Sequence, residues 1–296
     1  MISPVLLALG ANLSFSTASI VYAEYSKKYS PKWMNLLKAL VAFSAFSVTV
    51  LAFGLWEVPS FFSFLLFMAS GATGLMLGDL FLLRAYTLIG PARTLMIFGF
   101  SPIFLGVTAY FLFDQKFEWF RLIAIVFLIL CLFTFSIENY KRSGNWQIRG
   151  LILGFLAVAL DSAGLLMTRA AFDHSPAISS VEGNMIRALG AVAAFILAQP
   201  LLGPYDLKGN FLANPRNKRI LLLAASLGGT YVSLMLYLTA VKTGHLASIS
   251  AVAITAPLFA ALLECFRQKK WPSAYLSFGL LFFGIGFFIL FFETGK

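Results

Sequence analysis

The chain has 296 residues, of which 60% are hydrophobic and only 11% are charged, and its mean hydropathy is +0.87. Soluble domains carry about 25% charged residues, so this composition excludes an ordinary soluble protein. The formal net charge of +10 is compatible with nucleic-acid binding. However, the basic residues are scattered between apolar runs without interleaved aromatic residues, which excludes that class.

The apolar runs predict an all-α polytopic membrane protein. A helix needs about 20 mostly apolar residues to cross a hydrocarbon core of about 30 Å. The run Leu122–Phe135 is apolar on every side, whereas a β-barrel strand would alternate apolar and polar residues. In chain order the predicted transmembrane helices, about ten, lie near residues 3–23, 33–54, 60–83, 91–113, 118–138, 149–169, 178–202, 219–241, 245–266 and 272–292.

The basic residues are unevenly divided between the two sides of the predicted helices. Of the 22 Lys and Arg residues, fifteen lie in the loops after odd-numbered spans, five lie on the opposite side and two lie within spans. Cytoplasmic loops are enriched in Lys and Arg. The charge pattern therefore predicts that the loops after odd-numbered spans are cytoplasmic and that both termini are outside.

Several short patterns occur twice. The segment 35–40, Asn-Leu-Leu-Lys-Ala-Leu, returns at 184–189 as Asn-Met-Ile-Arg-Ala-Leu, and Pro102 has a counterpart in Pro257. A copy with an odd number of spans enters the bilayer upside down relative to its twin, and such inverted repeats are typical of alternating-access carriers. We therefore predict two inverted five-helix repeats, at residues 1–145 and 146–296.

These duplicated motifs resemble the drug/metabolite transporter superfamily, specifically ten-span carriers with two EamA-type repeats. The residues that carry the resemblance are Ser30-Pro31 before Lys38, Ser175-Pro176 before Arg187, Ala85–Ala92, Ala240–Ala247, Ser101-Pro102-Ile103-Phe104 and Ala256-Pro257-Leu258-Phe259. The resemblance implies a transporter with both termini in the cytoplasm, in conflict with the charge pattern. The chain also lacks the family's usual Gly-Glu pair at the end of the fourth helix of each repeat, where it has Phe113-Asp114 and Phe266-Arg267.

Two cations within predicted spans are the favoured substrate-binding residues. Lys38 and Arg187 are repeat-related and lie about one turn into the second helix of each copy. Together they can hold a carboxylate or phosphate, and arginine does so with a bidentate fork. Asn35 and Asn184 are three residues earlier on the same helical face and add amide groups. Snorkelling of both cations to the interface is the alternative interpretation.

Three buried acidic residues are candidates for proton coupling. Asp79 follows the glycine-rich run 71–78, and Asp161 lies about twelve residues into its helix, which is near mid-bilayer. Ionisable residues inside a membrane are expensive and usually functional. The structural alternatives are an ion pair of Asp79 with Arg84 or Lys38, and a hydrogen bond from Asp161 to Ser or Thr. Glu182 lies near the entrance of its span, where gating and a helix N-terminal charge are equally compatible with it.

Two prolines and two tyrosines complete the candidate site. Pro102 and Pro257 have no N–H to donate, so each frees a carbonyl and predicts a hinge, with an ordinary packing kink as the alternative. Tyr86 and Tyr231 are predicted substrate-binding residues because a hydroxyl group is expensive to leave unpaired in hydrocarbon.

The sequence as a whole predicts a secondary active transporter that moves a small polar metabolite, such as an amino acid, by alternating access. The alternatives are a phosphate-ester or nucleotide-sugar-like antiporter, a lipid-linked flippase and a non-transporting membrane scaffold. No nucleophile–base pair, metal-ligand cluster or phosphate-binding loop is found, so we expect no enzymatic activity, cofactor or metal. The expected partners are the small-molecule substrate, the lipid bilayer and coupling protons. The expected setting is a bacterial inner membrane, and a monomer or homodimer is expected.

Overall fold

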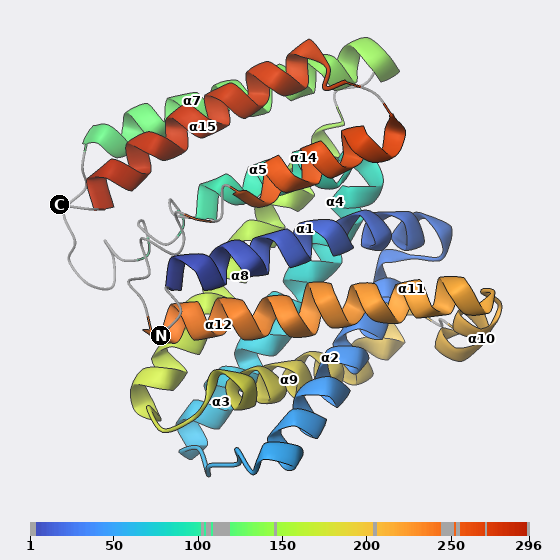
Figure 1. Cartoon of the computed structure of the whole chain (residues 1–296), viewed down its shortest axis with the longest axis vertical. Coiled ribbons are helices and arrows are strands. Elements are labelled where there is room, and N and C mark those ends of the chain that lie inside the picture. Colours follow the sequence, from blue (N-terminus) through green and yellow to red (C-terminus); the bar gives the residue numbers. More distant parts are fainter. Residues whose placement is uncertain are drawn as a thin grey trace.

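The computed structural model describes residues 4–101, 119–144, 147–203, 206–243, 255–269 and 271–294, together with residues 104, 108 and 252. Every regular element in these ranges is a helix (Figure 1). The helices are α1 (Pro4–Lys28), α2 (Pro31–Phe53), α3 (Phe61–Ser70), η1 (Gly71–Gly78), α4 (Asp79–Ile89), α5 (Pro91–Ile97), η2 (Phe98–Phe100), α7 (Trp119–Ser143), α8 (Ile148–His174), α9 (Ser180–Leu202), α10 (Leu207–Leu212), α11 (Arg216–Ser226), η3 (Leu227–Val232), α12 (Ser233–Thr243), α14 (Thr255–Gln268) and α15 (Ala274–Thr294).

Six stretches of the described chain are long and apolar enough to cross a membrane. Two shorter apolar helices lie at Val126–Glu138 and Ala274–Ile289. This finding does not establish the ten transmembrane helices that the sequence predicts, nor their arrangement in two repeats. The six stretches are Leu6–Lys28, Pro31–Phe53, Phe61–Ile89, Ile148–His174, Ser180–Leu202 and Arg216–Lys242.

Local sequence signals explain where α2 and α9 begin. The Ser30 hydroxyl accepts a hydrogen bond from the Trp33 N–H at 3.1 Å, and Pro31 occupies the first turn of α2, where its missing N–H breaks no helical bond. The Ser179 hydroxyl accepts from the Glu182 N–H at 3.1 Å in the same way. Helix α2 ends at Gly54, whose φ of 60° is the left-handed conformation that favours glycine.

Two of the long helices are interrupted by π-helical turns. The stretch 61–89 contains η1 between α3 and α4, and the stretch 216–243 contains η3 between α11 and α12. Gly74 lies in η1 and Gly229, 155 residues later, lies in η3. π-Helical turns are rare and often occur at functional sites, so η1 and η3 are candidate positions for a functional site.

The packing brings the two halves of the chain together around the π-helical turns. Segment η1 packs against α8 and α9, whereas η3 packs against α1 and α2. Helices α2 and α9 also pack on one another, and α7 packs mainly on α15 at one edge of the bundle (Figure 1). Each π-helical turn therefore lies among helices from the other half of the chain.

The segment between the predicted spans at 178–202 and 219–241 contains the short helix α10. The Asp206 carboxylate caps this helix by accepting a hydrogen bond from the Gly209 N–H at 2.7 Å. The side chain of Trp33 donates a weak hydrogen bond to the Leu207 carbonyl at 3.4 Å, which holds α10 against the start of α2.

Candidate functional site

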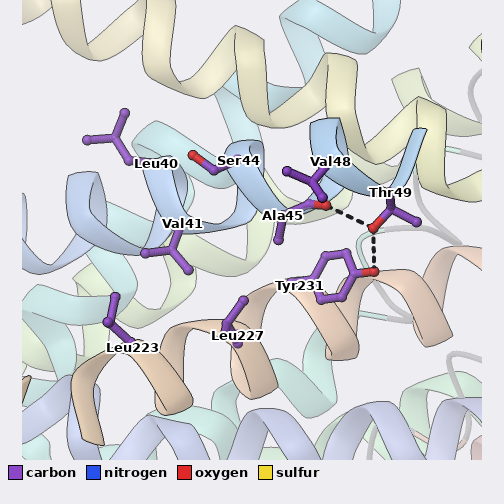
Figure 2. Close-up of a pocket in the computed structure, with 9 residues that line it drawn as sticks. All are labelled: Leu40, Val41, Ser44, Ala45, Val48, Thr49, Leu223, Leu227 and Tyr231. Carbon is purple, nitrogen blue, oxygen red and sulfur yellow. Dashed lines mark hydrogen bonds between the residues drawn. The ribbon is translucent and has the colours of Figure 1, made fainter. Parts of the chain in front are cut away.

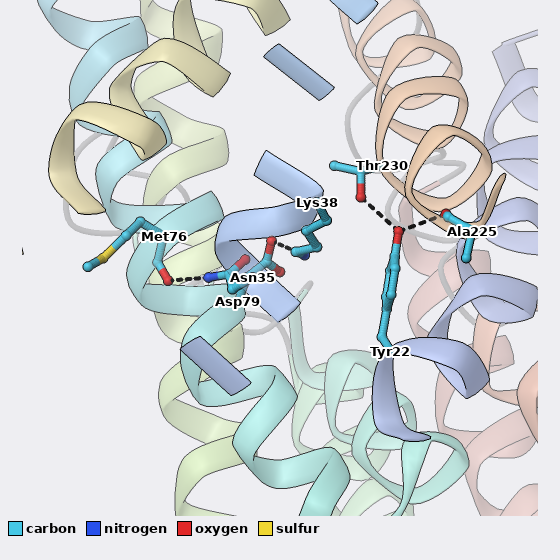
Figure 3. Close-up of polar contacts among 7 residues, drawn as sticks. All are labelled: Tyr22, Asn35, Lys38, Met76, Asp79, Ala225 and Thr230. Atoms are coloured by element: carbon cyan, nitrogen blue, oxygen red, sulfur yellow. Dashed lines mark hydrogen bonds and ion pairs between the residues drawn. The ribbon is translucent and has the colours of Figure 1, made fainter. Parts of the chain in front are cut away.

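Lys38 forms an ion pair inside the bundle. Its Nζ lies 2.5 Å from Oδ2 of Asp79, and the two side chains are 3% and 16% exposed (Figure 3). The Lys38 ammonium also lies 5.4 Å from the centre of the Tyr22 ring, and cations are attracted to the faces of such rings. Asp79 therefore has the Lys38 partner that the structural interpretation of this residue predicts.

Two side chains near this pair have buried polar atoms with unsatisfied hydrogen-bonding capacity among the described residues. The Asn35 amide donates to the Met76 carbonyl of η1 at 2.9 Å (Figure 3). Its Oδ1 is buried and has no hydrogen-bond partner among the described residues, and the same holds for the buried hydroxyl of Tyr86. Unpaired buried polar groups are costly, so each of these two atoms would gain from a hydrogen-bond partner.

Arg187 lies on α9 and is held by neutral groups instead of a carboxylate. Its Nε donates to the Ser70 hydroxyl at 2.9 Å, and its Nη1 lies 3.4 Å from Oδ1 of Asn184. The Asn184 amide in turn donates to the Leu234 carbonyl at 3.0 Å. Ser70 is also hydrogen-bonded to Thr168 at 2.6 Å, so α3, α8 and α9 meet at the guanidinium group.

Arg187 and Asp161 both lie beside Gly74. A Cβ atom added at Gly74 would lie 3.8 Å from the Nη2 of Arg187 and 3.8 Å from the Oδ1 of Asp161. The absence of a side chain at this position lets the guanidinium and the carboxylate both lie close to the backbone of η1. Among the described residues Asp161 makes no ion pair or hydrogen bond, although it lies within Coulombic range of Asp79, Arg187 and Lys38. The four charged groups thus form one cluster on both sides of η1.

Glu182 lies outside this cluster. It is completely buried, and its Oε1 accepts a hydrogen bond from the Glu57 N–H at 2.8 Å, in the loop between α2 and α3. Its Oε2 is buried without a partner among the described residues. Lys242 is the cation within Coulombic range of Glu182, and its Nζ donates to the backbone carbonyls of Pro176 and Ile178. Glu182 therefore connects loops at one end of the bundle.

Tyr231 lines an apolar groove (Figure 2). The groove has a volume of about 540 Å³ and lies between α2 and the α11–η3 segment. The Tyr231 hydroxyl is 2.8 Å from the Thr49 hydroxyl, and its ring packs against Phe46. The groove is bordered by side chains that are exposed at the molecular surface, including Val48 at 65%. It is lined by Leu40, Val41, Ser44, Ala45, Val48, Thr49, Leu223, Leu227 and Tyr231.

One of the two predicted hinge prolines lies among the described residues. Pro102 lies outside the described residues, and Pro257 is near the start of the described part of α14. The Ser16 hydroxyl donates to the Ala256 carbonyl at 2.8 Å, and the Asn12 amide donates to the Val252 carbonyl at 2.7 Å. Polar side chains of α1 therefore satisfy carbonyl groups around the proline, as transmembrane helices require.

Sequence reasoning missed two contributors to the cluster, Ser70 and Thr168, which bind or support the Arg187 guanidinium. The Tyr22 hydroxyl joins α1 to η3 through the Thr230 hydroxyl at 2.8 Å and the Ala225 carbonyl at 2.9 Å. The position of Ser70 directly before the run of glycines was the signal available for the first of these residues.

Comparison with known proteins supports the resemblance seen in the sequence. Residues 2–137 match the EamA-like transporter family. One solved structure, described only as the crystal structure of a protein, has a TM-score of 0.68 and 15% identity, and the match covers 98% of this chain and 96% of its own. At that identity the likeness shows the fold alone. No curated protein matches the chain. The match covers residues 2–137, somewhat less than half of the chain, and together with the six apolar stretches of spanning length it supports a multi-pass membrane transporter of the EamA type within the drug/metabolite transporter superfamily.

Proposed function

We propose that this protein is a secondary active transporter that moves a small polar metabolite with both an acidic and a basic group by alternating access. An amino acid is the simplest such solute. The observation that carries the proposal is the position of the Arg187 guanidinium and the Asp161 carboxylate, which both lie beside Gly74 and form no ion pair with one another among the described residues. The proposed setting is a bacterial inner membrane.

The charge balance of the cluster favours a zwitterionic solute. Asp79 already neutralises Lys38, whereas Arg187 and Asp161 are not in direct contact. A carboxylate of the solute can accept two hydrogen bonds from the guanidinium of Arg187. An ammonium group of the same solute can donate to Asp161, so that both buried charges gain a partner in one binding event.

Asp161 is the proposed coupling residue. A charged carboxylate inside a membrane is costly without a direct partner, and either a proton or the ammonium group of the solute can neutralise Asp161. The ammonium group of the solute and the proton then compete for the same carboxylate. Competition of this kind couples the exit of one to the entry of the other, which makes the transporter an exchanger of solute for protons.

The test uses purified protein in liposomes. Solute flux is measured with and without a pH gradient for the wild type and for Asp161→Asn, Asp79→Asn and Asp173→Asn. The Asp173 side chain is 61% exposed and lies on the same helix as Asp161, so it is the matched control. We expect Asp161→Asn to abolish the dependence of flux on the pH gradient and Asp173→Asn to retain it. Dependence that persists in Asp161→Asn contradicts the assignment.

Ligand class is tested by thermal shift, because a ligand that binds the folded state stabilises it by RT ln(1 + [L]/Kd). Amino acids, sugar phosphates and quaternary amines are compared at equal concentration. Stabilisation by amino acids alone, and its loss in Gly74→Leu, is the expected result. Stabilisation by sugar phosphates favours the phosphate-ester antiporter, in which Lys38 and Arg187 both bind the anion.

A lipid-linked flippase is the second candidate because of the apolar groove in Figure 2. The side chains at its outer border are exposed at the surface of the helix bundle, where a membrane protein contacts lipid. An acyl chain can therefore enter the groove from the side. Ala45→Phe narrows this groove without touching the charged cluster. If Ala45→Phe stops transport and Asp161→Asn does not, the substrate is lipid-linked and the exchanger proposal is wrong.

A further inference from the structure

One end of the helix bundle gathers loops that are far apart in the sequence. Arg267 of α14 lies 2.5 Å from Glu24 of α1. Lys28 donates to the Asn214 side chain at 2.9 Å, beside α10, and Lys32 donates to the last carbonyl of α9 at 2.5 Å. In Figure 1 this is the end that carries α10, and we call it the α10 end. The ends of α1, α9 and α14 and the starts of α2, α11 and α15 belong to it.

The α10 end is strongly basic. The carboxylates of Glu24 and Glu138 are each paired with an arginine there, and Asp206 caps α10. Most of the cations at this end have exposed side chains, and they outnumber the described carboxylates there. Those with exposed side chains are Lys27, Lys28, Lys141, Arg149, Lys208, Arg216, Lys218, Arg267 and Lys269.

The opposite end has a different charge. There the loop after α2 meets the loop before α9, through Glu57 and Glu182 and through a hydrogen bond from the Ser60 N–H to the Ser175 hydroxyl at 3.1 Å. The described acidic residues at this end are Glu57, Asp173 and Glu182, and the described cations are Arg169 and Lys242. Charges of both signs are therefore nearly balanced at this end.

Such asymmetry has a known consequence for a membrane protein. Short loops rich in Lys and Arg stay in the cytoplasm during insertion, and the anionic lipids of the cytoplasmic leaflet attract basic residues. The loops of the α10 end are short enough for this rule to apply. Helix α1 has 25 residues, about 37 Å at 1.5 Å per residue, so Pro4 and Lys28 lie at opposite faces of the membrane.

We propose that the α10 end faces the cytoplasm, with its basic side chains against anionic phospholipid headgroups, and that the start of α1 and the end of α15 lie outside. This orientation is opposite to the one that the family resemblance implies. It depends only on the chain spanning a membrane and is independent of which solute is carried.

The test is cysteine labelling in intact cells with a membrane-impermeant maleimide. The native Cys131 is buried and Cys265 is half-buried, and both are replaced by alanine to give the background. Val58→Cys reports on the opposite end, where the native side chain is 85% exposed, and Asn217→Cys reports on the α10 end. Size-exclusion chromatography of each variant verifies that it is folded.

The expected result is at least tenfold stronger labelling of Val58→Cys than of Asn217→Cys in intact cells, with equal labelling after permeabilisation. Lys269→Cys and Asp173→Cys form a second pair, with the same expectation, in case either variant of the first pair does not fold. Labelling of the α10 end in intact cells, or equal labelling of both ends, overturns the proposal. Neither result bears on the solute-exchange proposal, because no transport is measured.

Discussion

The two basic residues of the duplicated segment have different surroundings. Lys38 has a carboxylate partner at 2.5 Å within its own half of the chain. Arg187, at the corresponding position, is held by a hydroxyl and an amide, and the nearby Asp161 does not reach it. We propose that Lys38, which is already neutralised, contributes mainly to the fold, whereas Arg187, which has no direct carboxylate partner, is available to a ligand. This proposal divides the cluster into a structural part and a binding part.

The largest expected effect on stability comes from the structural part. Lys38→Met leaves the Asp79 carboxylate buried without its partner, and breaking a buried pair in this way costs about 3–5 kcal/mol. We expect a large drop in the melting temperature of the detergent-solubilised protein. Fluorescence-detected size-exclusion chromatography after heating measures this temperature.

The double variant Lys38→Met/Asp79→Asn is the control, because it removes both charges. It should regain most of the lost stability, since replacing both members of a buried pair is often nearly neutral. A single variant as stable as the wild type would show that the pair does not hold α2 against α4.

Arg187→Gln tests the binding part. This substitution removes the guanidinium group, which is the proposed partner of the anionic group of the solute. Losing one partner of a buried charged pair costs about 2–5 kcal/mol of binding free energy. Thermal stability without solute should be retained or should increase, because a buried charge with no counterion is removed. Isothermal titration and the melting temperature, measured on the same preparation, provide the two readouts.

Arg187→Lys sharpens the same comparison. It keeps the charge and loses the planar fork, so solute affinity should fall less than in Arg187→Gln but should not be fully retained. If Arg187→Gln melts as low as Lys38→Met, the two cations have the same structural role and the division of the cluster is wrong.

The close approach of the two halves at η1 is the next test. A Cβ added at Gly71 would overlap the backbone carbonyl of Arg187, which cannot move away as a flexible side chain can. Gly71→Ala should therefore destabilise the protein by about 1–3 kcal/mol through overpacking. Gly284→Ala in α15 is the matched control because nothing lies within 4 Å of its added Cβ. Equal melting temperatures of the two variants would contradict the packing of η1 on α9.

The positions of the helices were largely predictable, and the contacts of the charged residues were not. Long apolar runs predicted the spans at 31–53 and 180–202 to within about two residues, since length and hydropathy decide such elements. However, these helices are apolar around most of their circumference, so their periodicity gives little information on which face meets which neighbour. Lys38 and Asp79 are 41 residues apart, and their contact depends on the rotation of both helices.

The π-helical turns could not be predicted for a related reason. Small residues such as the glycines at 71, 74 and 78 permit close approach of a neighbouring helix, and the structure has Arg187, Asp161 and Gly164 beside the first two of them. A π-helical turn, however, arises from one extra residue in a helical turn, and tertiary packing stabilises it. Ser70 and Thr168 gain their role only from that packing, so neither residue type nor spacing pointed to the hydrogen bonds that surround Arg187.

The smallest expected effects separate two buried tyrosines near the Lys38–Asp79 pair. The Tyr22 hydroxyl has two hydrogen-bond partners, whereas the Tyr86 hydroxyl has none among the described residues. Tyr22→Phe should cost about 0.5–1.5 kcal/mol of stability for the lost hydrogen bonds. Tyr86→Phe should leave the melting temperature unchanged or slightly higher, because it removes an unpaired polar group. If the Tyr86 hydroxyl binds the solute, Tyr86→Phe raises KM for transport in liposomes while Tyr22→Phe changes mainly stability. A drop in melting temperature for Tyr86→Phe with unchanged KM would instead assign this tyrosine to the structural part of the cluster.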